Sequence, residues 1–263
     1  MKNIVICGDS FSIGIGCHNL KDEPYGSLLA KNFNAELTNY AKGSSTNLSI
    51  FLQTKYALEK IKDIDLLIIG VTSFNRVEWF PEGVDTTKVL HLSNVNYHQY
   101  PPYGVMTYPY LLENPMKDDP NYKGEMFTEN FYGVVDYVDN VMSGKRGGGG
   151  YFVKFKNERP ERMKLIREYY ADVFDERIQR QFDIGIISTA HLLLKRKNIN
   201  HLVLTYDGEF TEYIDSQNIV NADFSALSQK YPDDMNTLHF SAEGHRILYE
   251  AIMKKIIKNG WDI

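Results

Sequence analysis

The sequence predicts an α/β fold, a doubly wound, flavodoxin-like three-layer α/β/α sandwich with a central parallel sheet and a long insertion. Three short segments predict its strands, "KNIVICG", "AELTNYA" and "IDLLIIG". The first and third are continuous apolar runs that end in glycine, which is typical of strands buried on both faces of a parallel sheet. Helical segments separate the three, and strands that alternate with helices indicate right-handed βαβ units.

The predicted helices follow in order along the chain. The first, in "DEPYGSLLAKNF", has acidic residues and a proline at its start. The second, in "STNLSIFLQTKYALEKI", begins with candidate capping residues. A long helical region over 161–197 precedes a fourth strand, "HLVLTY", and a last helix follows Ser241. Ligands of doubly wound sheets bind beyond the carboxyl ends of the strands, so we expect the turns after the strands to meet at one edge.

The α/β pattern is interrupted over 78–160, a stretch rich in tyrosine, proline and asparagine. A segment of this length without regular structure is unusual in a compact domain unless it is a lid, a binding surface or an added subdomain. We therefore expect a single domain over 1–263 that carries a lid or partner-binding subdomain at 78–160. A surface flap or an oligomer contact explains the tyrosines equally well.

Composition and charge limit the kinds of molecule that the protein is expected to bind. The chain has 263 residues and a formal net charge of -5, which gives no general field for attracting nucleic acid. The first apolar run is too short for a signal peptide or a membrane span, so we expect a cytoplasmic protein without a membrane partner. The two cysteines form no metal-binding pattern, so we expect no metal. We expect no cofactor either, since the glycines after the first strand lack the spacing of a dinucleotide site.

The stretch "VICGDSFSIGIG" places a serine in the turn after the first strand. Serine is a poor nucleophile until a base removes its proton, so Ser10 needs a histidine at the same edge. His239 is the best candidate because it lies in the loop before the last helix, where a doubly wound chain returns to that edge. His18 is a local rival, and His245 lies inside the helix and is expected to be structural. Asp9 is expected to bond its own backbone in the turn.

Three blocks of the sequence resemble the SGNH or GDSL-type serine hydrolases, in this order: "GDSFSIG", "NYAKGSSTN" and "NTLHFSAEGH". The resemblance implies that Ser10 is the nucleophile and His239 its base. It also implies an oxyanion hole made by the backbone amides of Ser10 and Gly43. The residues of the blocks are most similar to those of a divergent branch of phage and bacterial proteins of unassigned substrate.

Two departures from the family pattern concern the site. The family usually has an asparagine after the third strand as an oxyanion donor, whereas this chain has Thr72 there and Asn75 three residues later. Either side chain is a candidate donor. The family also has an aspartate three residues before its histidine, whereas this chain has Asn236. Asp233 and Asp234 are the alternative residues to orient His239.

The resemblance implies a serine-dependent ester hydrolase, of the esterase or carbohydrate deacetylase type, that forms an acyl-enzyme on Ser10. Candidates for substrate contacts are Asn47, Arg76 and Glu78, although Arg76 and Glu78 suit an ion pair with each other. The alternative function is a weakly active or inactive binding or structural protein on the same scaffold, for example a virion component. In that case segment 78–160 would bind a protein partner or a second copy of the chain.

Overall fold

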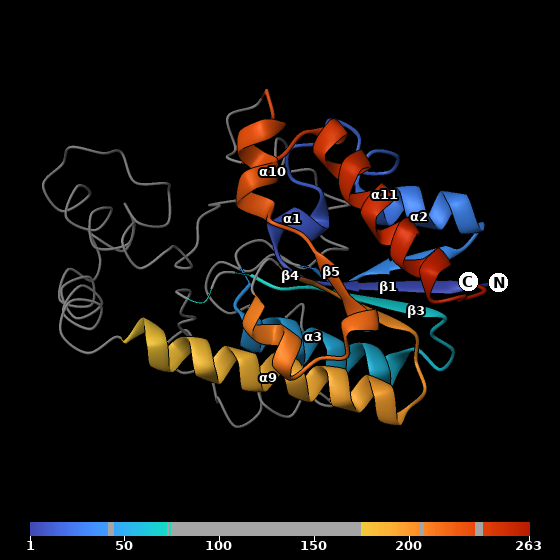
Figure 1. Cartoon of the computed structure of the whole chain (residues 1–263). Helices are drawn as coiled ribbons and strands as arrows, with labels where there is room; N and C mark the ends of the chain where they lie inside the picture. Colours follow the sequence, from blue (N-terminus) through green and yellow to red (C-terminus); the bar gives the residue numbers. More distant parts are fainter. Residues whose placement is uncertain (42–44, 73, 75–174, 206–207, 235–238) are drawn as a thin grey trace, which may run out of the picture.

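The computed structural model describes residues 1–41, 45–72, 74, 175–205, 208–234 and 239–263 (Figure 1). Their strands form one five-stranded parallel sheet in the order β2-β1-β3-β4-β5. The strands are β1 (Asn3–Cys7), β2 (Glu36–Asn39), β3 (Leu66–Gly70), β4 (His201–Thr205) and β5 (Ile219–Asn221). This order is that of a flavodoxin-like doubly wound sheet, so the predicted fold class is confirmed. The expected segment 78–160 lies outside the described residues.

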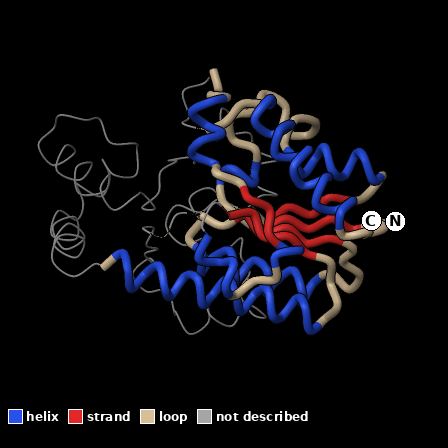
Figure 2. Tube along the Cα trace, viewed as in Figure 1, coloured by secondary structure: helices blue, strands red, loops and turns tan. Residues whose placement is uncertain are grey.

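Helices cover both faces of the sheet, which makes the three layers seen in Figures 1 and 2. On one face lie α1 (Ser10–Ile13), α2 (Tyr25–Phe33), α10 (Phe224–Lys230) and α11 (Ala242–Lys258). On the other lie α3 (Asn47–Lys60) and α9 (Glu176–Arg196), side by side. Two short 3-10 turns, Gly208–Glu212 and Ser216–Asn218, lie between β4 and β5. None of the described helices is both long and apolar enough to cross a bilayer.

The side chains of β1, β3 and β4 alternate between two hydrophobic clusters. Ile4 and Ile6 of β1 pack with α2 and α11, whereas Val5 and Cys7 pack toward α3 and α9. Strand β3 divides in the same way, and all five of its residues are buried. Strands with both faces covered show continuous apolar runs in the sequence, which is why β1, β3 and β4 are easily predicted.

Two elements escape a sequence-based prediction. Strand β5 has three residues, and only Val220 of these is buried. Helix α10 has seven residues, too few to show a clear periodicity, although Asp223 caps its first turn by accepting from the amide of Ala226. Both are held by tertiary contacts, β5 through its ladder with β4 and α10 through packing of Phe224 in the core.

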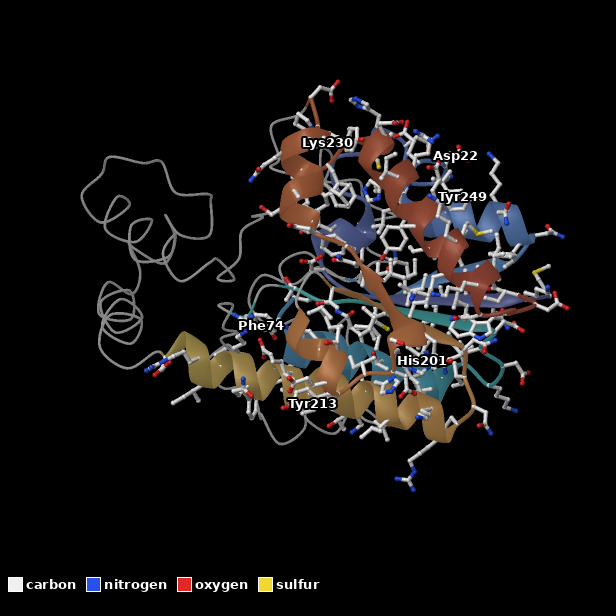
Figure 3. All side chains as sticks on the ribbon, in the orientation of Figure 1. Asp22, Phe74, His201, Tyr213, Lys230 and Tyr249 are labelled. Atoms are coloured by element: carbon white, nitrogen blue, oxygen red, sulfur yellow. The ribbon has the colours of Figure 1, made fainter. Side chains whose placement is uncertain are left out.

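Three histidines are buried in the layers. His201, at the start of β4 on the α9 side of the sheet (Figure 3), donates Nδ1–H to the carbonyl of Ile199. Its Nε2 therefore accepts from Nδ1 of His191, 2.8 Å away. His245 lies in α11 between the rings of Tyr25 and Phe240. Burial lowers the pKa of His201 to about 4, and burial followed by the nearby His239 lowers the pKa of His245 to about 3.

We predict that these histidines make the protein sensitive to acid. Their pKa values are lower in the folded than in the unfolded chain, so the unfolded state binds protons first as the pH falls below about 6.5. Each then removes about 1.4 kcal/mol of unfolding free energy per pH unit until its folded pKa is reached. In His245→Phe, urea denaturation between about pH 6 and pH 4.5 should show a slope smaller by about that amount.

A matched control is Leu248→Ala, which truncates a buried side chain of the same helix without removing a titrating group. This variant should be less stable at every pH and keep the slope of the wild type. Equal slopes for His245→Phe and the wild type would contradict the assignment of acid sensitivity to His245.

Candidate active site

The turn after β1 is fixed by one of its own side chains and by one from α3. Asp9 is the N-cap of α1 and accepts from the amide of Phe11 at 3.0 Å, as expected for a turn residue. The amide of Gly8 donates to Oε1 of Gln53 at 2.8 Å, and the Gly8 carbonyl accepts from Nε2 of the same residue at 3.2 Å. These bonds hold the backbone on which Ser10 begins α1.

Helix α1 lies directly against the ends of two strands. A Cβ atom on Gly8 would lie 2.2 Å from Oγ of Ser12, and one on Gly70 would lie 2.3 Å from the same atom. Larger residues at either position would push α1 away from the sheet. Ser12 is held in turn by the hydroxyl of Tyr25, and its carbonyl accepts from Nδ2 of Asn39. The glycines that end β1 and β3 therefore allow the close packing that positions Ser10.

His239 reaches this turn from the loop before α11. Its Nε2 lies 2.7 Å from Oγ of Ser10, although 229 positions separate the two residues. The ring also contacts Phe11, with 4.6 Å between centroids. Ser10 is almost buried and His239 is half-buried. The structure thus brings together the predicted nucleophile and its predicted base at hydrogen-bond distance, which is the geometry that activates a serine.

The backbone of His239 is anchored by Asp233. The amide of His239 donates to Oδ2 of Asp233 at 3.0 Å, and the amide of Asp233 donates to the carbonyl of His239 at 3.1 Å. A bridge between Pro232 and Phe240 closes the same loop. Asp233 therefore sets the position of the His239 backbone.

Asp234 forms a hydrogen bond with a residue outside this loop. Its carboxylate lies 2.9 Å from Nε2 of His18, which follows α1. His18 is thus bound to Asp234 at the surface, whereas His239 is the histidine that reaches Ser10. The pair connects the chain after α1 with the loop that carries His239.

Thr72, a candidate oxyanion donor, and Asn47, a candidate for substrate contacts, both make buried hydrogen bonds within the protein, and their expected roles stay predictions. The hydroxyl of Thr72 donates to Oδ2 of Asp9 at 2.8 Å, so in this arrangement it points its proton at Asp9. Asn47 is fully buried and binds both the amide and the carbonyl of Thr72. The reason is that both residues lie under the turn, where each polar group requires a partner within the protein.

Five of the predicted site residues lie outside the described residues: Gly43, Asn75, Arg76, Glu78 and Asn236. The expected roles of these residues, in the oxyanion hole, in substrate contacts and in orienting His239, stay predictions.

Two buried residues of the site have no counterpart in the sequence-based predictions. Gln53, which holds Gly8, falls on the same face of α3 as the buried Ile50 and Ala57. Asp183, which accepts from Asn47, falls on the same face of α9 as the buried Ile187 and Ala190. A polar residue on the apolar face of a helix is a detectable signal, because a buried polar group requires a partner.

Neither of the two cysteines is a candidate nucleophile in place of Ser10. Both are free and buried, and burial raises the pKa of each thiol to about 12. A thiol becomes a nucleophile as its thiolate, so neither cysteine is activated. Within the described residues, no group of three or more His, Cys, Asp or Glu side chains is arranged to hold a metal ion.

Comparison with known proteins gives matches among solved structures only. The chain is similar to the acetyl xylan esterase AlAXEase, with 11% identity over 97% of this chain and 99% of that chain, at a TM-score of 0.41. It is also similar to the salicylyl-acyltransferase SsfX3 from a tetracycline biosynthetic pathway, with 13% identity over 98% of this chain and 55% of that chain, at a TM-score of 0.37.

A third similar structure is a protein of the G-D-S-L family from Desulfitobacterium hafniense DCB-2, with 14% identity over 97% of this chain and 99% of that chain, at a TM-score of 0.31. No protein-family model and no curated protein sequence matches the chain. The sheet itself is flavodoxin-like, and the chain carries Ser10 after the first strand and His239 before the last helix.

We predict that Gly16→Ala displaces the loop that carries His239. Gly16 has a φ of +102°, and a Cβ there would lie 2.5 Å from the carbonyl oxygen of Phe240 and 3.1 Å from Cβ of His239. The free energy of unfolding should fall by about 1–3 kcal/mol from backbone strain alone. Urea denaturation measures this loss, and a crystal structure of the variant should show His239 Nε2 beyond hydrogen-bond distance of Ser10.

Gly185→Ala is the matched control, because a Cβ at this position in α9 meets nothing within 4 Å. It should be as stable as the wild type or more stable by about 0.5–1 kcal/mol, since alanine favours helix. An unchanged Ser10 to His239 distance in Gly16→Ala would show that the loop accommodates a side chain there.

Proposed function

We propose that the protein is a serine-dependent ester hydrolase that forms an acyl-enzyme on Ser10. The single observation that carries this proposal is the contact of 2.7 Å between Oγ of Ser10 and Nε2 of His239. The contact lies at the carboxyl edge of the parallel sheet, where doubly wound proteins bind their ligands. The two residues come from opposite ends of the chain, and each lies in its own sequence block.

The chemistry follows from this pair. Ser10 Oγ attacks the carbonyl carbon of the ester while its proton passes to Nε2 of His239. The carbonyl π bond becomes an oxyanion, for which the backbone amides of Ser10 and Gly43 are the proposed donors. When the oxyanion collapses, the bond to the alcohol breaks and the His239 proton goes to the departing oxygen. Water then attacks the acyl-enzyme, gives its proton to His239 and releases the acid, and Ser10 regains its proton.

A small acyl group is the proposed substrate class. The turn around Ser10 is built of small residues, and the aromatic ring of Phe11 lies beside His239. Because Ser10 is only slightly exposed, the acyl group that reaches it must be slender. Acetyl esters, including those on carbohydrates, satisfy this requirement.

We expect Ser10→Ala and His239→Ala to abolish hydrolysis of p-nitrophenyl acetate and butyrate. Removing either member of such a pair costs roughly 10⁴-fold or more in kcat. A fluorophosphonate probe should label the wild type and leave Ser10→Ala unlabelled. Equal background rates and absent labelling in all three proteins would refute the hydrolase and favour the binding role.

We expect Asn236→Asp to raise the activity. An asparagine can orient an imidazole but cannot stabilise the imidazolium that forms during the reaction, and in a serine protease triad the loss of this carboxylate costs about 10,000-fold. Restoring it should increase kcat for p-nitrophenyl acetate by about tenfold or more.

The control for this gain is Asn236→Leu, which removes the side-chain amide without adding a charge and should lower kcat. An activity that is the same in the wild type and Asn236→Asp would assign the orientation of His239 to another residue, with Asp233 as the first candidate.

A further inference from the structure

A carboxylate is buried on the side of the sheet opposite α1. Asp183 lies in the first half of α9 and is 1% exposed. It shares the inner face of the helix with Ile187, Ala190 and Leu194, which pack against the sheet. An ionised carboxylate in such a position is costly unless hydrogen bonds satisfy it. Its bonds therefore show what this residue does in the fold.

Two side-chain amides donate to Asp183. Nε2 of Gln179, one turn earlier in α9, donates to Oδ1 at 2.9 Å, and Nδ2 of Asn47 donates to Oδ2 at 2.9 Å. Helices α3 and α9 lie side by side under the sheet (Figure 1), so this second bond joins the two. Both carboxyl oxygens of Asp183 accept from side-chain amides, and Oδ2 therefore holds the amide group of Asn47 with its nitrogen toward α9.

The orientation of Asn47 matters because this residue clamps the chain after β3. Its Oδ1 accepts from the amide of Thr72 at 3.0 Å, and its Nδ2 donates to the carbonyl of Thr72 at 3.1 Å. If the amide group turned over, both contacts would be mismatched. Asp183 thus selects the one orientation of Asn47 that binds Thr72.

Thr72 transmits this arrangement to the nucleophile turn. Its hydroxyl donates to Oδ2 of Asp9 at 2.8 Å, while Oδ1 of Asp9 accepts from the amide of Phe11. Ser10 lies between Asp9 and Phe11 in the sequence. Asp183, Asn47, Thr72 and Asp9 form one chain of buried groups from α9 to α1, and all four are at most 3% exposed.

We propose that Asp183 is a positioning residue of the Ser10 site, which fixes the nucleophile turn through Asn47, Thr72 and Asp9. The proposal rests on the function proposed above, in which Ser10 must meet His239. Asp183 touches neither Ser10 nor a reacting atom. It acts by removing an alternative orientation of Asn47 and, with it, alternative positions of Thr72 and Asp9.

The test uses a thiol as a reporter of position. Ser10→Cys places a thiol beside His239, and the rate of its alkylation by iodoacetamide depends on that contact. Cys7 and Cys17 give little background because burial raises the pKa of both thiols. Mass spectrometry of peptides assigns the alkylated site in each protein.

In the Ser10→Cys background, Asp183→Leu should slow alkylation at pH 7 by about tenfold, within the range typical of coupling through a packed network. The pH midpoint of alkylation should move upward, because a thiol displaced from His239 is no longer favoured as the thiolate. Asp183→Asn should alkylate within about threefold of the parent, since its Oδ1 takes the place of the Asp183 oxygen that accepts from Asn47, and its Nδ2 donates to Gln179 once that amide has turned over.

Leu194→Ala is the control for a merely structural role, because it truncates a buried side chain on the same face of α9. Per folded molecule it should alkylate at the parent rate with an unchanged pH midpoint. The proposal is overturned if Asp183→Leu alkylates like the parent, or if Leu194→Ala slows alkylation equally.

A fluorophosphonate probe applied to the protein with Ser10 intact separates the two proposals. Absent labelling there refutes the hydrolase function, whatever the alkylation rates. Labelling there, together with parent-like alkylation of Asp183→Leu, refutes the positioning role alone.

Discussion

The close approach of α1 to the ends of β1 and β3 is the constraint on which the site depends. Gly8 and Gly70 leave no atoms between Ser12 and the strand ends, so the first helix begins as soon as the first strand stops. Ser10 then lies at the helix start, at the carboxyl edge of the sheet. Any larger residue at these glycines would separate α1 from β3 and from the chain that follows it. The positions of Thr72, Asp9 and Ser10 are therefore set by one packing contact.

The polar side chains under this turn form a hydrogen-bond network that holds the backbone in position. Gln53 satisfies both backbone groups of Gly8, and Asn47 satisfies both backbone groups of Thr72. These buried side-chain amides supply the hydrogen bonds that a neighbouring strand would supply, at positions beyond the end of the strand ladder. Because an unpaired buried polar group costs about 1–3 kcal/mol, the network strongly favours a single arrangement. These hydrogen bonds therefore fix the backbone of the serine turn.

The histidine side of the site is built differently. His239 lies in a loop that is held by Asp233 and by the bridge between Pro232 and Phe240, and its ring contacts Phe11. The chain beyond α1 approaches so closely that only glycine is accommodated at position 16. A buried, hydrogen-bonded serine turn thus contacts a half-buried loop that carries His239. The proposed reaction requires that Ser10 and His239 stay at hydrogen-bond distance. The hydrogen-bonded turn holds the proposed nucleophile, while the loop supplies the proposed base.

The sequence by itself determined the strands β1, β3 and β4, the long helices, the turn that carries Ser10 and the choice of His239 as its partner. These follow from local signals: apolar runs, helical periodicity, glycine after a strand and the order of three short blocks. Only the tertiary structure decided how the buried polar residues pair. Thr72 bonds to Asp9, Asn47 to Thr72 and Asp183, and Asp234 to His18. β5 and α10 belong with these, because they are too short to be stable without their neighbours. The physical reason is that periodicity records which face of an element is buried, whereas a hydrogen bond between distant residues depends on the distance between elements, which the packing of the whole sheet sets.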